Sequence, residues 1–358
     1  MSGIFGALNL NDSDRVFNAT VGQRAIYDIA VQYVQQQNAA LNQVLSVFVD
    51  ETTEEYKRRY KLPGGGRLQR TGQFAAPGST RAIGSWDVAF PLEDFGAQVS
   101  ADRVTMGYMT VVELERHINT VVQQNVNTVR FEMLKALFNS SQDTFVDTLW
   151  GSLSIEPLAN GDSVTYPPVL GSESEATENH YLETGYASAS VSDSNDPYET
   201  IIDELDEHFG VQTGGSEIVA FINNAQRGVT SALTDFESVP DRDIQPGQNT
   251  AIPINLPALP GRTLGRHASG CWIQEWRWVP ANYILAVHMG APKPLVMRAD
   301  PADTGLPRGL ALVAEDMEHP FRSTYWAHRF GFGCGNRLNG VVVELGTGGS
   351  YTIPTAYQ

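Results

Sequence analysis

The histidines and cysteines of this sequence carry the side chains best suited to catalysis or metal binding, but their spacing matches no established motif. None of the seven histidines forms an H-x-H or H-E-x-x-H pattern, so the spacing supports no zinc site. Cys334 lies among glycines, in the sequence Gly331-Phe332-Gly333-Cys334-Gly335. A nucleophilic cysteine needs a nearby base, here His328, and a strand-turn-helix setting, and no helix is expected after Cys334. We therefore interpret Cys334 as a small thiol packed between strands.

Two further segments have the residue types of a binding site. The triple glycine Gly64-Gly65-Gly66 lacks the Lys-Ser/Thr that follows a phosphate-binding loop, so we interpret it as a flexible hairpin tip. The acidic cluster Asp203-Glu204-Asp206-Glu207 has the charge to attract a divalent cation, but acidic residues on one helix face with an apolar face behind them usually form a solvated surface. We therefore expect no catalytic residue, no metal ligands and no cofactor, and we expect that the protein is not an enzyme.

The net charge of −17 is concentrated in one segment, because residues 140–220 contain 16 acidic residues and no Lys or Arg. Residues 56–86 contain no Asp or Glu and hold seven basic residues: Lys57, Arg58, Arg59, Lys61, Arg67, Arg70 and Arg81. Opposite charges of this size favour pairing, within one subunit or between neighbours, although two separately solvated surfaces are an equal alternative. A chain this acidic would mostly repel the phosphate groups of nucleic acid. Binding to free nucleic acid is therefore disfavoured.

Length and composition predict a globular protein. The 358 residues suffice for one large domain or two modest ones, and 42% of them are hydrophobic. We find no apolar stretch long enough to cross a bilayer and no signal peptide at the N-terminus. The two cysteines predict no disulfide framework and indicate assembly in a reducing cytoplasm.

Apolar periodicity predicts three helices. The first, Gly22–Val47, has an apolar stripe and a Gln/Asn-rich outer face. The second, Thr110–Asn139, begins with a capping box of Thr110 and Glu113 and would be about 45 Å long. A third begins at the capping residue Asp196.

Several segments between these helices have the pattern of strands. Residues 52–108 are expected to form a long, poorly packed two-stranded excursion, whose second strand begins with the alternating residues from Trp86 to Leu92. An apolar run at residues 218–222 predicts a buried strand. Strands at Cys271–Val279 and Tyr283–Met289, joined by three residues, favour a hairpin. Near the end of the chain we expect strands at Thr324–Phe330 and Gly340–Leu345, separated by the glycine-rich segment.

The order of these parts resembles the major capsid protein of tailed bacteriophages, the Hong Kong ninety-seven type, which encapsulins share. The resemblance covers the whole chain and rests on architecture, with closing strands that include His328-Arg329-Phe330 and Asn339-Gly340-Val341-Val342. It implies an α+β fold with an N-arm at 1–48, an E-loop at 49–108, a peripheral domain at 109–195 and 312–358, and an axial domain at 196–311. The helix at 110–139 would be the spine helix of the peripheral domain.

The resemblance implies a structural function. The chain would assemble into an icosahedral shell of hexamers and pentamers around double-stranded DNA, bound without sequence specificity and without a membrane. Separate scaffolding, cement and portal proteins are possible partners, and the chain would reside in the virion capsid after assembly in the host cytoplasm. An encapsulin-type nanocompartment is the first alternative, and an acidic soluble hydrolase is the second.

The contacts between subunits are expected to use two sets of residues. The seven basic residues of the E-loop would lie on the acidic segment of an adjacent subunit. Ile29 and Val34, on the stripe of helix Gly22–Val47, would contact a scaffold or a neighbour. The alternative for this helix is that it packs beneath its own spine helix.

Overall fold

The computed structural model describes residues 23–61, 68, 70–71, 85–167, 169, 175–209, 218–238, 259–316 and 321–358. The chain divides into two compact units, and neither is continuous in sequence. The first unit contains the described parts of Met1–Asn42, Glu93–Val129 and Asp300–Arg329. The rest of the described chain forms the second unit. No helix of the described residues is both long and apolar enough to span a membrane.

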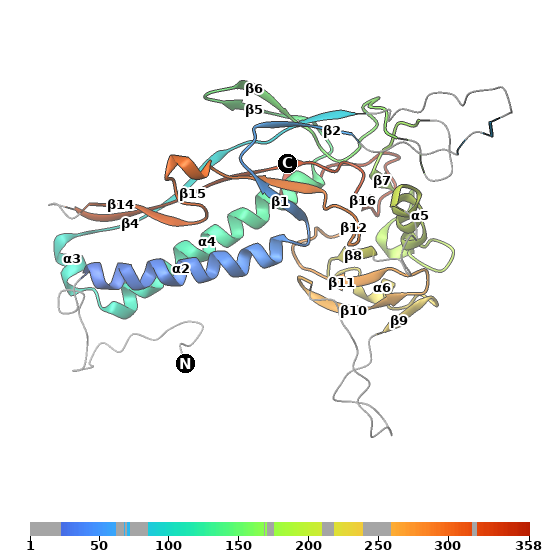
Figure 1. Cartoon of the computed structure of the whole chain (residues 1–358). Helices are drawn as coiled ribbons and strands as arrows, with labels where there is room; N and C mark the ends of the chain where they lie inside the picture. The colour runs from blue at the N-terminus through green and yellow to red at the C-terminus, as the bar shows by residue number, and fades with distance from the viewer. Residues whose placement is uncertain are drawn as a thin grey trace. The chain divides into compact units, whose positions relative to one another are not determined.

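Two long helices run side by side through the core of the first unit, which contains most of each helix (Figure 1). These are α2 (Gln23–Leu45) and α4 (Val111–Phe138), each predicted to within about two residues. The capping box of α4 is present, because Glu113 accepts a hydrogen bond from the Thr110 N–H at 2.8 Å and the Thr110 hydroxyl accepts one from the Glu113 N–H at 3.3 Å. Local signals of periodicity and capping therefore suffice to define both helices.

The helices of the first unit pack on a small sheet. Strands β4 (Glu93–Asp102) and β14 (Ala311–Asp316) both pair with β15 (Phe321–Cys334), and the short helix α3 (Arg103–Tyr108) follows β4. The core between helices and sheet contains apolar residues of α2, α4, β4 and β15, together with Leu310 just before β14: Ala30, Val34, Val99, Leu114, Ile118, Val121, Val122, Leu310 and Trp326. The stripe of α2 therefore has a partner within its own chain.

The second unit is built on a mixed seven-stranded sheet. Its strands are β7 (Tyr181–Glu183), β8 (Ile218–Ile222), β9 (Phe236–Ser238), β10 (Arg262–His267), β11 (Trp272–Glu275), β12 (Tyr283–His288) and β16 (Val341–Glu344). Their spatial order is β7-β16-β12-β8-β11-β10-β9. Helix α5 (Pro197–Phe209) packs on this sheet, while α6 (Arg227–Thr230) is a single turn.

The order of this sheet corrects one prediction. The short connection between β11 and β12 favoured a hairpin, but β8 lies between them, parallel to β11 and antiparallel to β12. Every residue of β8 is buried, as expected for a central strand that is covered on both faces. The buried strand β8 occupies the position between β11 and β12. These two strands therefore do not pair with each other, although the predicted connection between them is short.

The second unit also contains three smaller pairings. Strand β1 (Val49–Thr53) is parallel to β13 (Leu295–Arg298), which is antiparallel to the last residues of β15. Strands β2 (Lys57–Tyr60) and β3 (Trp86–Ala89) form an antiparallel pair, as do β5 (Asp143–Asp147) and β6 (Gly151–Ile155).

The excursion expected at 52–108 is well packed along β3. Trp86, Val88 and Phe90 are buried, in a cluster that includes Tyr166 and Val296. The indole N–H of Trp86 also donates to a backbone carbonyl at 3.1 Å. The prediction of a poorly packed excursion was therefore wrong for β3, because its apolar residues face the core of the second unit.

The glycine-rich segment was expected to separate two strands, but all of it except Gly335 lies within β15. A Cβ atom added to Gly333 would stand 2.6 Å from the ring of Phe90, and one added to Gly331 would collide with the Pro91 backbone. These glycines therefore allow close approach of the chain after β3, and do not mark a turn.

Candidate functional site: charged and apolar surfaces of the second unit

The basic residues at the described end of the predicted E-loop have acidic partners beside them in their own chain. Arg59 binds Asp87 through two hydrogen bonds, at 2.5 and 3.0 Å, and the Lys57 ammonium lies 3.2 Å from the same carboxylate. The hydrogen bond from Arg59 is the main reason why the pKa of Asp87 is lowered to about 2. Arg58 contacts Glu51 and donates to Glu55 at 2.6 Å.

These pairs leave the cations partly available. The side chain of Arg59 is 65% exposed and that of Lys57 is 48% exposed. The acidic partners lie just outside residues 56–86. A charge count restricted to that segment therefore overstates the net positive charge of this part of the surface. Exposed pairs of this kind contribute little to stability.

The structure places the other predicted contact residues differently. Lys61 and Arg70 are exposed, whereas Arg67 and Arg81 lie outside the described residues. The side chain of Ile29 is also outside them.

Val34 is only 2% exposed and packs in the core of the first unit. This placement favours the alternative that α2 packs on α4, the predicted spine helix of its own chain.

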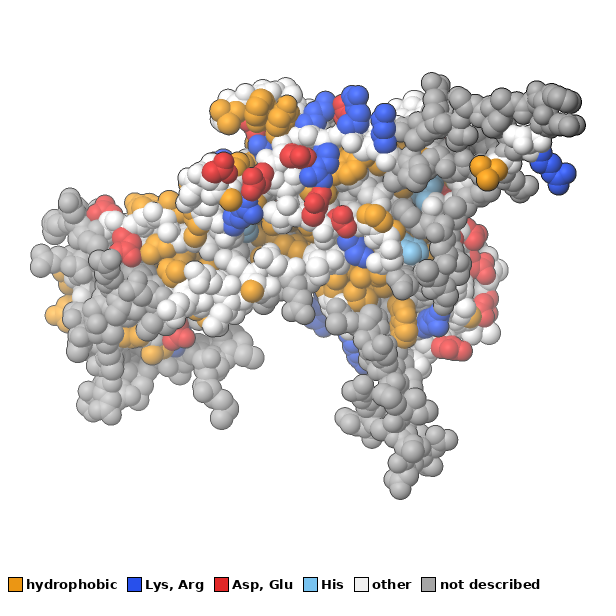
Figure 2. Space-filling view, viewed as in Figure 1, with side chains coloured by type: hydrophobic (Ala, Val, Ile, Leu, Met, Phe, Trp, Pro, Cys, Tyr) orange, Lys and Arg blue, Asp and Glu red, His pale blue; other side chains and the backbone are white. Residues whose placement is uncertain are grey.

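An exposed apolar patch, not singled out by the sequence, lies at the turn between β5 and β6. Val146, Leu149 and Trp150 are 72%, 82% and 53% exposed, and Trp150 stacks on Tyr56 at 4.2 Å between ring centroids. Figure 2 shows the hydrophobic side chains gathered over β5 and β6, with Lys and Arg side chains next to them. Exposed apolar side chains that lie together are typical of protein contact sites.

A buried ion pair holds this turn. Asp147 accepts hydrogen bonds from the N–H groups of Leu149 and Trp150 at 2.8 and 3.2 Å, and from Arg298 at 2.9 Å. Arg298 also donates to the Phe90 carbonyl at 2.9 Å. Burial alone would raise the pKa of Asp147, but these hydrogen bonds lower it below its usual value. The pair thereby ties the apolar turn to the strands beneath it.

The candidate nucleophile is poorly suited to catalysis. Cys334 is buried, and burial raises the pKa of its thiol to about 12, so the reactive thiolate is disfavoured at neutral pH. Its structural interpretation, a thiol packed among strands, fits this environment.

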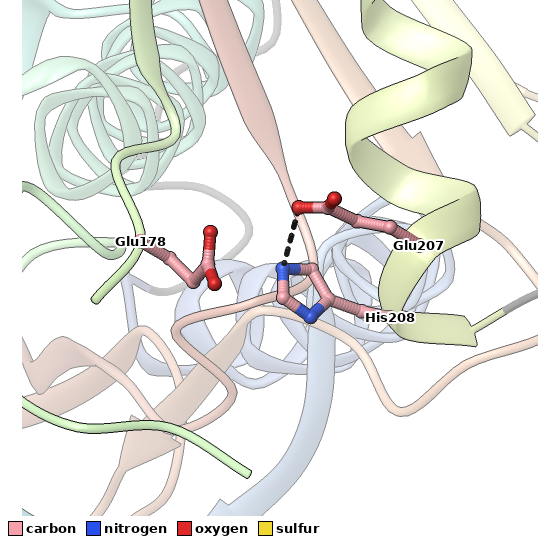
Figure 3. A group of neighbouring side chains, drawn as sticks. All are labelled: Glu178, Glu207 and His208. Atoms are coloured by element: carbon pink, nitrogen blue, oxygen red, sulfur yellow. Dashed lines mark ion pairs between the residues drawn. The ribbon is translucent and has the colours of Figure 1, made fainter. Parts of the chain in front are cut away.

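A polar cluster that includes part of the predicted acidic surface lies at the end of α5. Glu178, Glu207 and His208 place ligand atoms within 4.8 Å of one another (Figure 3). Burial raises the pKa values of Glu178 and Glu207, each with help from a neighbouring carboxylate, and burial lowers that of His208 to about 4. The solvated surface expected for Asp203-Glu204-Asp206-Glu207 is thus partly turned inwards.

Comparison with known proteins identifies the fold. No family model and no curated protein matches the chain. A solved structure from Mycobacterium phage Patience matches with a TM-score of 0.68 and 17% identity, over 98% of each chain. The chain has the fold of phage capsid proteins.

A second structure with this capsid fold is the mature capsid of bacteriophage PhiM1, which matches with a TM-score of 0.51 and 10% identity. That match covers 82% of this chain and 85% of the other. The predicted α+β fold class is confirmed.

Proposed function

We propose that this chain is the major capsid protein of a tailed phage, and that it assembles into an icosahedral shell around double-stranded DNA. The observation that carries the proposal is the fold, which matches the Mycobacterium phage Patience structure over 98% of the chain and the mature capsid of bacteriophage PhiM1 over 82%. The function is structural, and the expected N-arm, E-loop, peripheral domain and axial domain are the parts that build the shell.

The surfaces of the second unit support an assembling protein. A shell subunit needs surfaces that remain partly uncovered in the isolated chain. The apolar turn around Leu149 and Trp150 and the exposed cations of β2 have this property, and they come from neighbouring parts of the same unit. An apolar centre with charged residues beside it is the usual composition of a protein–protein interface.

The charge of the chain also fits packaged DNA. With a net charge of −17, the chain would bind the duplex weakly and without sequence specificity, so DNA could move inside the shell. We infer that hexamers and pentamers form the shell in the host cytoplasm, with scaffolding, cement and portal proteins as separate partners.

Size-exclusion chromatography of the purified full chain, followed by negative-stain microscopy, tests this proposal. The expected result is material in the void volume that appears as closed shells or as rings of five and six subunits. A small, uniform oligomer at every concentration tested would favour the soluble hydrolase instead. Shells that enclose protein cargo and exclude DNA would favour the encapsulin-type nanocompartment.

A further inference from the structure

Five ionisable side chains converge where α5 ends beside the segment before β7, all within the second unit: Glu178, His180, Glu204, Glu207 and His208. Glu207 and His208 project from α5, and Glu178 faces them from the other segment (Figure 3). The two segments are far apart in sequence, so their convergence is a product of the fold.

The orientation of His180 is an observation independent of the carboxylates. The ring is fully buried, and its Nδ1 lies 2.9 Å from the Gly340 carbonyl, which can only accept a hydrogen bond. The proton of the neutral ring therefore resides on Nδ1, and the lone pair of Nε2 points towards His208. Metal-binding histidines have this arrangement, with the second ring nitrogen donating to a carbonyl or a carboxylate.

Two distances match those of a small tetrahedral site. With metal–nitrogen and metal–oxygen bonds of about 2.0–2.2 Å, neighbouring ligand atoms are roughly 3.3–3.6 Å apart. The Nε2 atoms of His180 and His208 are 3.3 Å apart, and Nε2 of His208 is 3.6 Å from a carboxylate oxygen of Glu207. The ligand atoms of Glu178, Glu207 and His208 lie within 4.8 Å of one another, and His180 joins this group through its contact with His208.

The cluster gathers more negative than positive charge. Glu204 has a carboxylate oxygen 4.0 Å from Nε2 of His180, beside the carboxylates of Glu178 and Glu207. A bound cation would relieve the repulsion between these carboxylates.

We propose that His180, His208, Glu207 and Glu178 bind one divalent transition-metal ion of the zinc type. Two imidazoles with two carboxylates suit Zn²⁺, whereas Ca²⁺ and Mg²⁺ prefer oxygen ligands alone. The ion ties α5 to the segment before β7 and so stiffens one part of the second unit. This site does not depend on shell assembly.

Isothermal titration calorimetry of the full chain, stripped of metal with a chelator and titrated with zinc chloride, tests the proposal. The expected result is one zinc ion per chain and a rise in the thermal unfolding temperature. Cobalt(II) bound in place of zinc should show the intense visible absorption of tetrahedral coordination.

Matched variants assign the site. His208→Gln and Glu207→Gln should each weaken zinc binding by about 100-fold, since even loss of a residue that only supports a ligand costs about 10–100-fold. Glu199→Gln removes an exposed carboxylate from the first turn of the same helix, about two turns before Glu207, and should leave the affinity unchanged. Absence of one-to-one zinc binding by the folded wild-type chain would overturn the proposal, as would wild-type affinity in both ligand variants.

Discussion

Truncation of Val34 to alanine distinguishes a core role of α2 from a role between subunits. Val34 is 2% exposed and packs with Leu114, Ile118 and Trp326 in the core of the first unit. Asn38, one turn further along α2, fixes the helix by donating to the Leu310 carbonyl at 3.0 Å and accepting from the Leu310 N–H at 3.3 Å. These contacts indicate that α2 is part of its own subunit.

The magnitude follows from the atoms removed. Val34→Ala deletes two methyl groups, each worth about 0.8 kcal/mol of transfer free energy, and the cavity left among well-packed neighbours adds to this loss. We expect the free energy of unfolding of the unassembled subunit to fall by about 2–3 kcal/mol. Gln35→Ala changes the adjacent exposed residue and should alter the stability by less than about 0.5 kcal/mol.

Urea unfolding of the unassembled subunit, followed by circular dichroism, measures both variants. The reasoning would be refuted if Val34→Ala unfolded like the wild type but no longer formed shells, because Val34 would then act between subunits. Reduced stability, with shells still formed below the new midpoint, is the predicted result.

Four further outcomes are expected. The pKa of His328 is lowered by burial to about 4, so below about pH 6.5 the unfolded chain binds a proton that the folded chain does not. Stability should therefore fall by about 3 kcal/mol between pH 6.5 and 4, and His328→Gln should reduce this slope in pH-dependent urea unfolding. Asp147→Asn leaves Arg298 buried without its counter-charge and should cost about 3–5 kcal/mol, much of it recovered by adding Arg298→Met, as thermal unfolding would reveal. Reversal of Arg67 and Arg70 to Glu should impair assembly with normal subunit folding, and normal shells in negative stain would contradict the proposed E-loop contact. Mature shells should be noncovalent, so a boiled denaturing gel should show one band and no high-mass ladder.

The elements defined by local signals were predictable from the sequence. Helix α4 needed only its capping box and its apolar period, and β8 needed only its apolar run. The prediction of a hairpin between β11 and β12 was wrong because β8, about 50 residues earlier in the chain, lies between them. No local sequence pattern indicates this strand order.

The same reason limited the prediction of the polar sites. Asp87, the partner of Lys57 and Arg59, lies beyond the predicted hairpin tip and is visible only when β2 and β3 are paired in register. His180 and His208 are 28 residues apart, so no metal motif of fixed spacing includes both. Their approach requires the packing of α5 on the sheet.

Electron cryomicroscopy of the full chain after soluble expression tests the central claim most directly. We predict closed shells, or curved fragments of hexamers and pentamers, whose wall density fits this fold with the turn around Trp150 at a contact between subunits. Isolated subunits or small oligomers as the sole species at high protein concentration, in the absence of any curved assembly, would contradict the account.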